Sequence, residues 1–278
     1  MGAPAAIALD AAGNIYFADS SAGRIRKVTA APPVSGVAPA IAAGGIVNAA
    51  SFGATEISPG SIISIFGSGF GTAISVASTV PLPTTLGGAR VLLNGIEAPL
   101  FAVTPTQINL QAPWQLRAPA ITAANVEVVT AGGRSPARMI VFGDQPGIFT
   151  TQQNGQGPGI ITHANGSLVT LANPAANGEV LVIYCTGLGA VTNQPASGGI
   201  SPSGPLAVSM VTPNVTIGNI AARVLFAGLA PGYIGLYQVN VELPANARPL
   251  PGDPDGPVVR VSTTVGSLRG NIVTLALR

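Results

Sequence analysis

The sequence predicts an all-β protein: two tandem immunoglobulin-like antiparallel β-sandwiches, preceded by a short strand-rich N-terminal segment. Three observations support this fold class. Short runs rich in Val, Ile and Thr alternate with turn signals drawn from 36 glycines and 25 prolines. A strand that stops at a proline occurs twice, which indicates an internal repeat. No segment of useful length shows the 3.6-residue periodicity of a helix.

The repeated strand is Gln107–Pro113, and its second copy is Gln238–Pro244. Polar and apolar residues alternate in both, so one face of the extended strand is apolar and the other carries amides. Each copy stops at a proline, which cannot donate to a sheet ladder. Similar glycine clusters precede them at Gly67–Gly71 and Gly187–Gly189. Their spacing does not match a nucleotide-binding fingerprint, so they predict turns that need positive φ. We interpret the amides as structural, tying a strand edge to a neighbouring loop in each sandwich.

Composition argues against several classes of function. The charged fraction is 8%, against about 25% in typical soluble domains, and the net charge is +2. Lys27 is the only lysine, and no basic stripe suggests nucleic acid as a partner. Apolar runs are far shorter than the roughly 20 residues of a spanning helix, so no membrane span is expected. Cys185, the only cysteine, lies in an apolar run and is predicted to be a buried thiol. No signal-peptide pattern is visible at the N-terminus.

The N-terminal segment predicts three short strands, at Ala6–Leu9, Asn14–Ala18 and Arg24–Val28, with turns between them. The sequence of residues 8–28, ALDAAGNIYFADSSAGRIRKV, resembles one NHL repeat, the blade unit of a β-propeller. One blade cannot close a propeller. The predicted organisation is therefore, in chain order, an NHL-like single-blade segment (1–29), a Pro/Ala/Gly linker (30–45), a first sandwich (46–143), a bridging segment with a hairpin (144–176) and a second sandwich (177–278).

Residues 46–278 also resemble the Solibacter-type C-terminal domain, a functionally uncharacterised family found at the end of large secreted acidobacterial proteins. The resemblance lies in VNAASF (47–52), SPGSIISIFGSGFG (58–71), LPTTLGGARVLLNGIEAPLF (82–101), TPTQINLQAPW (104–114), PGIF (146–149), GEVLVIYCTGLGAV (178–191) and FAGLAPGYIGLYQVNVELP (226–244). It implies a secreted or surface-exposed location, and it supplies no catalytic residues.

The residues that could carry chemistry favour no enzyme, cofactor or metal site. His163 is the only histidine, and no nucleophile-elbow motif accompanies it, so we interpret it as an ordinary hairpin residue. Asp253 and Asp255 lack the oxygen ladder of a calcium loop and predict a surface turn. A carboxylate pair for glycoside hydrolysis is not suggested, which leaves a hydrolase the least supported reading.

Candidate contact residues fall into three groups. Trp114, Tyr233 and Tyr237 could stack on a glycan or a partner, or could pack in the core. Two sequons, at Asn165 and Asn214, are possible glycosylation sites. A possible self-association arm has its apolar residues at Ile15, Tyr16, Phe17 and Ile25.

The function expected from these patterns is a non-enzymatic extracellular structural or assembly module: a surface stalk, an adhesin or a filament subunit. Exposed sheet edges are usually protected from strand addition by charged residues, especially lysine, and this chain has few charged residues and one lysine. Self-association by β-strand addition through the N-terminal arm is therefore expected, with copies of the chain or neighbouring extracellular modules as partners. The alternative is a carbohydrate-binding accessory module of a secreted multidomain protein.

Overall fold

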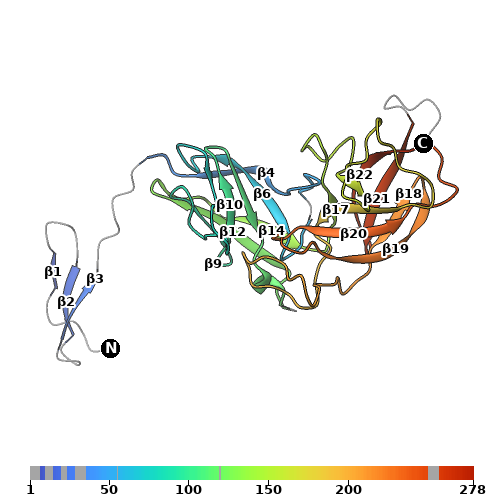
Figure 1. Cartoon of the computed structure of the whole chain (residues 1–278). Coiled ribbons are helices and arrows are strands. Elements are labelled where there is room, and N and C mark those ends of the chain that lie inside the picture. Colours follow the sequence, from blue (N-terminus) through green and yellow to red (C-terminus); the bar gives the residue numbers. More distant parts are fainter. Residues whose placement is uncertain are drawn as a thin grey trace. The chain divides into compact units, whose positions relative to one another are not determined.

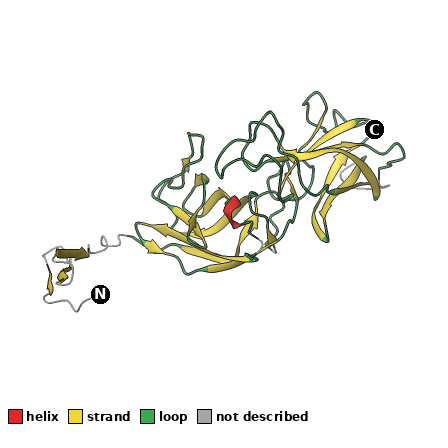
Figure 2. Ribbon diagram, turned by 90° about the horizontal axis from the view of Figure 1, so that it is seen from below, coloured by secondary structure: helices red, strands yellow, loops and turns green. Residues whose placement is uncertain are grey.

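The computed structural model describes residues 7–9, 15–19, 24–28, 36–54, 56–118, 120–249 and 257–278. The chain divides into two compact units, Met1–Gly36 and Val37–Arg278. The described residues are almost all strands and loops (Figure 1), and they include no α-helix. A single 3₁₀ turn, η2 (Trp114–Leu116), is the red element of Figure 2. None of the described residues forms a helix that is long and apolar enough to cross a membrane. The all-β prediction is confirmed.

The first unit is a three-stranded antiparallel sheet in which β2 lies between the other two strands. Its strands are β1 (Ile7–Leu9), β2 (Ile15–Asp19) and β3 (Arg24–Val28). They confirm the three predicted strands to within one residue at each end. The side chains of Ile15, Tyr16, Phe17 and Ile25, the predicted self-association arm, lie outside what the structure describes.

The first sandwich consists of two sheets packed over one core. The five-stranded sheet has the order β4-β6-β11-β10-β7, with strands β4 (Ala40–Asn48), β6 (Ile62–Ser68), β7 (Ser75–Val76), β10 (Leu100–Val103) and β11 (Gln107–Gln111). The facing sheet has the order β5-β14-β12-β8-β9, and β13 pairs with β12. Its strands are β5 (Glu56–Ile57), β8 (Arg90–Leu93), β9 (Ile96–Glu97), β12 (Ala123–Thr130), β13 (Gly133–Arg134) and β14 (Arg138–Phe142).

Alternation along the strands fills this core. Ile63 and Ile65 of β6 and Ile108 and Leu110 of β11 are fully buried, and they belong to one apolar cluster with residues of the facing sheet. Their neighbours on the same strands point to the other face of the sheet. The two amides Gln107 and Asn109 therefore lie on the outer face of the five-stranded sheet.

The predicted linker is shorter than expected, because β4 begins at Ala40 rather than near residue 46. Ala40 and Ile41 pair with Ser68 and Gly67 of β6, and the register shifts before pairing resumes at Ile46. Gly44 has a φ of 65°, a conformation that only glycine adopts at little cost, and it lies within this bulge. The sequence at 40–45 predicts an Ala/Gly linker because it lacks the alternation of apolar and polar residues that marks a strand. A bulged strand at the edge of a sheet does not need that alternation.

The second sandwich is formed by one continuous sheet that folds over its own core. Its order is β15-β17-β20-β19-β18-β21-β22, and β16 pairs with β17. The strands are β15 (Gly147–Ile148), β16 (Ile161–His163), β17 (Val180–Thr186), β18 (Asn214–Ile217), β19 (Ile220–Leu229), β20 (Tyr237–Glu242), β21 (Val258–Val265) and β22 (Leu268–Ala276).

Strand β19 allows this sheet to turn. Its first residues pair with β18, and from Arg223 onward it pairs with β20, with a register shift between Val224 and Phe226. A bulge bends a strand and increases its twist. The two terminal strands then meet through one side chain: Asn271 of β22 accepts a hydrogen bond from Ile148 N (2.8 Å) and donates one to Ile148 O (3.0 Å).

The segment predicted to bridge the sandwiches is part of the second one. Both β15 and β16 pair with β17. The predicted hairpin around Asn165-Gly166 is present as a turn in which Ser167 O accepts a hydrogen bond from His163 N (2.9 Å).

The internal repeat is reproduced in the strand pairing. Gln107 lies opposite Phe66 in the first sandwich, and Gln238 lies opposite Tyr184 in the second, and the same register continues along both strand pairs. Strands β11 and β20 are interior rather than edge strands, so the expectation that the amides tie a strand edge to a loop is wrong for the Gln-x-Asn pairs. These amides bond along their own strand: Gln107 Nε2 donates to Asn109 Oδ1 at 2.8 Å. Gln111, at the end of the first copy, does bond to loops.

Cys185 provides a chemical test of the second core. Its side chain is fully buried, and this burial raises the pKa of the thiol. Thiolate is the reactive form, so the native protein is expected not to react with a disulfide reagent such as dithionitrobenzoate at pH 8. Full reaction in denaturing urea is the internal control. Rapid labelling without denaturant would show that the core is open.

Candidate functional site

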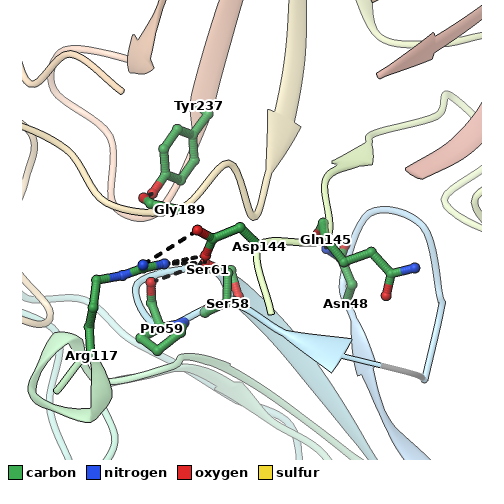
Figure 3. A network of polar contacts seen from close by, with 9 residues as sticks. All are labelled: Asn48, Ser58, Pro59, Ser61, Arg117, Asp144, Gln145, Gly189 and Tyr237. Carbon is green, nitrogen blue, oxygen red and sulfur yellow. Dashed lines mark hydrogen bonds and ion pairs between the residues drawn. The ribbon is translucent and has the colours of Figure 1, made fainter. Parts of the chain in front are cut away.

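The segment that connects the two sandwiches, between β14 and β15, is held by an ionic network (Figure 3). Asp144 of this segment pairs with Arg117, which follows η2, through both guanidinium Nη atoms. Ser58 Oγ donates to Asp144 Oδ1 at 2.8 Å, and Arg117 Nη2 donates to Ser58 Oγ at 3.0 Å. The side chains of Arg117 and Asp144 are less than one third exposed, so solvent screens this pair only partly.

The next residue, Gln145, holds the segment to both sandwiches. Its carbonyl oxygen accepts a hydrogen bond from Asn48 Nδ2 (3.2 Å), and its side chain donates to Arg269 O (3.3 Å). Asn48 is buried, and its Oδ1 also accepts bonds from the backbone of Ala50 and Ser51. Asp144 is therefore held to the first sandwich and Gln145 to both, so this segment cannot act as a hinge without breaking these bonds.

Trp114 makes an apolar contact between the two sandwiches. It belongs to η2 of the first sandwich, yet its ring packs in the core cluster of the second sandwich and is 4% exposed. Its backbone N donates to Ser197 Oγ at 2.9 Å. Gly60 lies against the ring: a Cβ there would approach Trp114 to within 2.1 Å, and its φ is +91°. The Ser58-Pro59-Gly60 turn therefore requires glycine to seat the indole.

Gln111, at the end of the repeated strand, also connects the two sandwiches. It is fully buried; Nε2 donates to Gly60 O (3.1 Å), and Oε1 accepts from Gly198 N (2.7 Å). Ile62 N donates to Thr186 Oγ1 at 3.0 Å, a further bond between strands of the two sandwiches. We call this set of contacts, centred on Asp144, Trp114 and Gln111, the junction.

The electrostatics of the junction do not assemble catalytic chemistry. Tyr237 is fully buried and donates its hydroxyl proton to Gly189 O. Burial raises the pKa of this hydroxyl, the nearby Arg117 charge lowers it, and Asp144 raises it. A hollow of 320 Å³ lies beside Arg117 and Asp144. Ser58 donates to a carboxylate already paired with arginine and has no histidine beside it, so it is not an activated nucleophile.

The three aromatic residues predicted as a stacking platform do not form one. Trp114 and Tyr237 are buried inside the second sandwich, and only Tyr233 is exposed, at 59%. The core reading of these residues, which the strand alternation also allowed, is the one that the structure supports for Trp114 and Tyr237. A lone indole reaches across to a neighbouring core because the Gly60 turn leaves room for it.

The remaining candidate residues have ordinary structural surroundings. His163 contacts Glu179 through Nδ1 and Asn173 O through Nε2. Asn165 lies in the hairpin turn and Asn214 on β18, both exposed, and their glycosylation stays a prediction. In the part of the chain that is described, no group of three His, Cys, Asp or Glu residues could hold a metal ion. Asp253 and Asp255 lie outside the described residues.

Sequence reasoning missed the ionic and amide residues of the junction: Asn48, Ser58, Gln111, Arg117 and Asp144. One signal was available. In a chain with so few charges, an Asp directly at a predicted sandwich boundary is a candidate for an ion pair with one of the few arginines.

Comparisons with known proteins give no family. No family model matches the chain, and no curated protein matches it. Among solved structures it is similar to SGBP-B from a complex xyloglucan utilization locus in Bacteroides uniformis (11% identity, TM-score 0.24), covering 86% of this chain and 48% of that one. It is also similar to the I9–I11 tandem from titin (8% identity, TM-score 0.21), covering 99% and 75%. The chain thus spans about half of the first of these, and likenesses at such TM-scores carry no functional argument.

Trp114→Ala tests the junction. Removing the indole leaves a cavity in the second core, and a loss of about 3–5 kcal/mol in the free energy of unfolding is expected. Urea denaturation followed by circular dichroism measures it. Tyr233→Ala, which removes an exposed aromatic side chain, is the matched control and should change stability by less than about 0.5 kcal/mol. Equally small losses of stability in Trp114→Ala and Tyr233→Ala would show that Trp114 does not join the sandwiches.

Proposed function

We propose that residues 37–278 form a rigid, non-enzymatic structural module of a secreted or cell-surface protein, in which two sandwiches hold neighbouring parts at a fixed separation and orientation. The observation that carries the proposal is the burial of Trp114, a side chain of the first sandwich, in the core of the second. Sandwiches joined by a flexible linker would each complete their own core. Here the second core includes a residue of the first.

The ionic and amide contacts support the same reading. Asp144 is paired within the first sandwich, Gln145 bonds to both sandwiches, and Gln111 bonds to loops of both. Inter-domain interfaces within a chain ordinarily permit relative motion unless they are large and apolar. The buried Trp114 and Gln111 make this junction resemble a domain core. A stalk or spacer needs this property, whereas an enzyme needs a reactive group, which the junction does not provide.

The extracellular location rests on sequence. Residues 46–278 resemble the Solibacter-type C-terminal domain, which implies a secreted or surface-exposed location. Residues 8–28 resemble an NHL repeat, and this agrees with a domain that is usually appended to propellers or other extracellular modules. The chain offers one lysine and a neutral surface of small polar residues, which suits packing against neighbouring modules. A stalk, adhesin or filament subunit is the specific role that we propose within this class.

Rigidity of the junction can be measured by distance. Spin labels on Met139→Cys and Met210→Cys would report on the two sandwiches, because these methionines are 72% and 69% exposed. Cys185 is buried and stays unlabelled in the native protein. Double electron–electron resonance should give one narrow distance distribution. The same labels with Trp114→Ala should give a broader one. A broad or two-peaked distribution in the otherwise unaltered protein would contradict a rigid module.

Self-association through the N-terminal unit is a second, separable part of the proposal. Strands β1 and β3 are the edges of a three-stranded sheet, and an unprotected edge can pair with a strand of another chain. Deleting residues 1–30 is expected to abolish oligomers or filaments seen by electron microscopy and to leave monomers. Unchanged assembly after the deletion would contradict a role of this unit in association.

A further inference from the structure

The outer face of the five-stranded sheet carries a groove that the junction does not use. A hollow of 620 Å³ is lined on one side by β6 and β11 and on the other by residues near 149–160 of the second sandwich. A second hollow of 460 Å³ adjoins it along β4 and β6, and the two share Phe66 and Gln107. Each volume lies within the range of about 300–1,000 Å³ that ligand pockets occupy. The shared residues make one elongated groove.

An amide pair in this groove has unused hydrogen-bonding groups. Asn109 Oδ1 accepts from Gln107 Nε2 (2.8 Å) and from Ser64 Oγ (2.9 Å), which fixes the orientation of the Asn109 amide. Its Nδ2 group and Gln107 Oε1 bond to no described residue, and neither atom is buried. The groove therefore presents a fixed donor and a fixed acceptor side by side. Hydroxyl groups, which both donate and accept, fit such a pair.

Aromatic rings surround the amides. Phe52, Phe66, Phe101 and Phe149 line the larger hollow, and all four are half-buried, so part of each ring faces the groove. Phe52 and Phe66 are stacked with their ring centres 6.3 Å apart. Among the described residues, no Asp, Glu, Lys or Arg lines either hollow. An apolar wall with directed neutral polar groups and no charge selects a neutral ligand that has both a flat C–H face and hydroxyl edges.

We propose that this groove binds a neutral polysaccharide chain, with pyranose rings stacked on Phe66 and its neighbours and with hydroxyl groups bonded to Asn109 Nδ2 and Gln107 Oε1. Two adjoining hollows leave room for more than one sugar unit, which favours a chain over a single sugar. This activity goes beyond the structural role proposed above, since a rigid spacer needs no ligand. It also places carbohydrate contact away from Trp114, Tyr233 and Tyr237.

The sharpest test is Asn109→Asp. The carboxylate keeps the size of the side chain, and one of its oxygens still accepts from Ser64 and Gln107. The groove-facing donor becomes a charged acceptor, so a hydroxyl that accepts from Asn109 and donates to Gln107 would meet two acceptors with only one proton and could satisfy only one of them. Isothermal titration calorimetry with cellohexaose, xylohexaose and laminarihexaose should detect binding of at least one, with hexagalacturonate as the anionic control. Asn109→Asp should weaken that binding about tenfold or more, by loss of the donor, and Phe66→Leu should weaken it about three- to tenfold, by loss of the ring face.

The repeat supplies the matched control. Asn240 accepts from Gln238 in the second copy of the strand, as Asn109 does from Gln107 in the first, but Val182 stands where the first copy has Ser64. Asn240→Asp should leave binding unchanged, and thermal melting should show that all variants are folded. No binding of any neutral hexasaccharide at millimolar concentration, or binding unaffected by Asn109→Asp, overturns the proposal. So does preferential binding of hexagalacturonate, or of an extended peptide at the β4 edge.

Discussion

Residues 37–278 depend on the burial of one indole outside its own sandwich. After the repeated strand the chain forms the turn η2, which begins at Trp114, and the Trp114 side chain packs in the core of the second sandwich. Burying a large aromatic side chain removes about 150–250 Å² from water, and here that gain requires both sandwiches at once. Gly60 provides the space for the ring, and the backbone of Trp114 is held by Ser197. The space at Gly60 and the bond to Ser197 are both used only when the two sandwiches are docked.

The polar contacts at the junction restrict the relative rotation of the two sandwiches, which the apolar contact of Trp114 alone would not fix. An indole alone would tolerate some rotation between the sandwiches, but Gln111 and Asp144 each have partners at fixed positions. Gln111 is fully buried and uses both ends of its amide, so rotation would leave a buried polar group unpaired. Asp144 is paired with Arg117 and Ser58, which are themselves bonded to each other. This ion pair holds the connecting segment to the first sandwich, and Gln145 next to it bonds to Arg269 O of the second.

The duplicated strand has two different uses. On its inner face, Ile108 and Leu110 fill a core, as their counterparts Val239 and Val241 do. On its outer face, the Gln-x-Asn amides bond to each other in both copies. The first copy adds a bond from Ser64, where the second has Val182, and in the first copy phenylalanines and residues of the other sandwich complete a groove. Duplication supplied the amide pair, and the docking of the sandwiches gave one copy a different environment.

The sequence by itself determined the strands, the repeat and the two cores, because these depend on local alternation and on turn residues that act over a few positions. It predicted β11 and β20 with their proline stops, the Asn165-Gly166 turn and the buried Cys185. It also left Trp114 open between surface and core. Only the tertiary structure decided that question, together with the partners of Asn48, Gln111 and Asp144 and the continuity of the second sheet through β19. These features join residues up to about a hundred positions apart, and no periodicity in a single chain records which distant side chain will meet which.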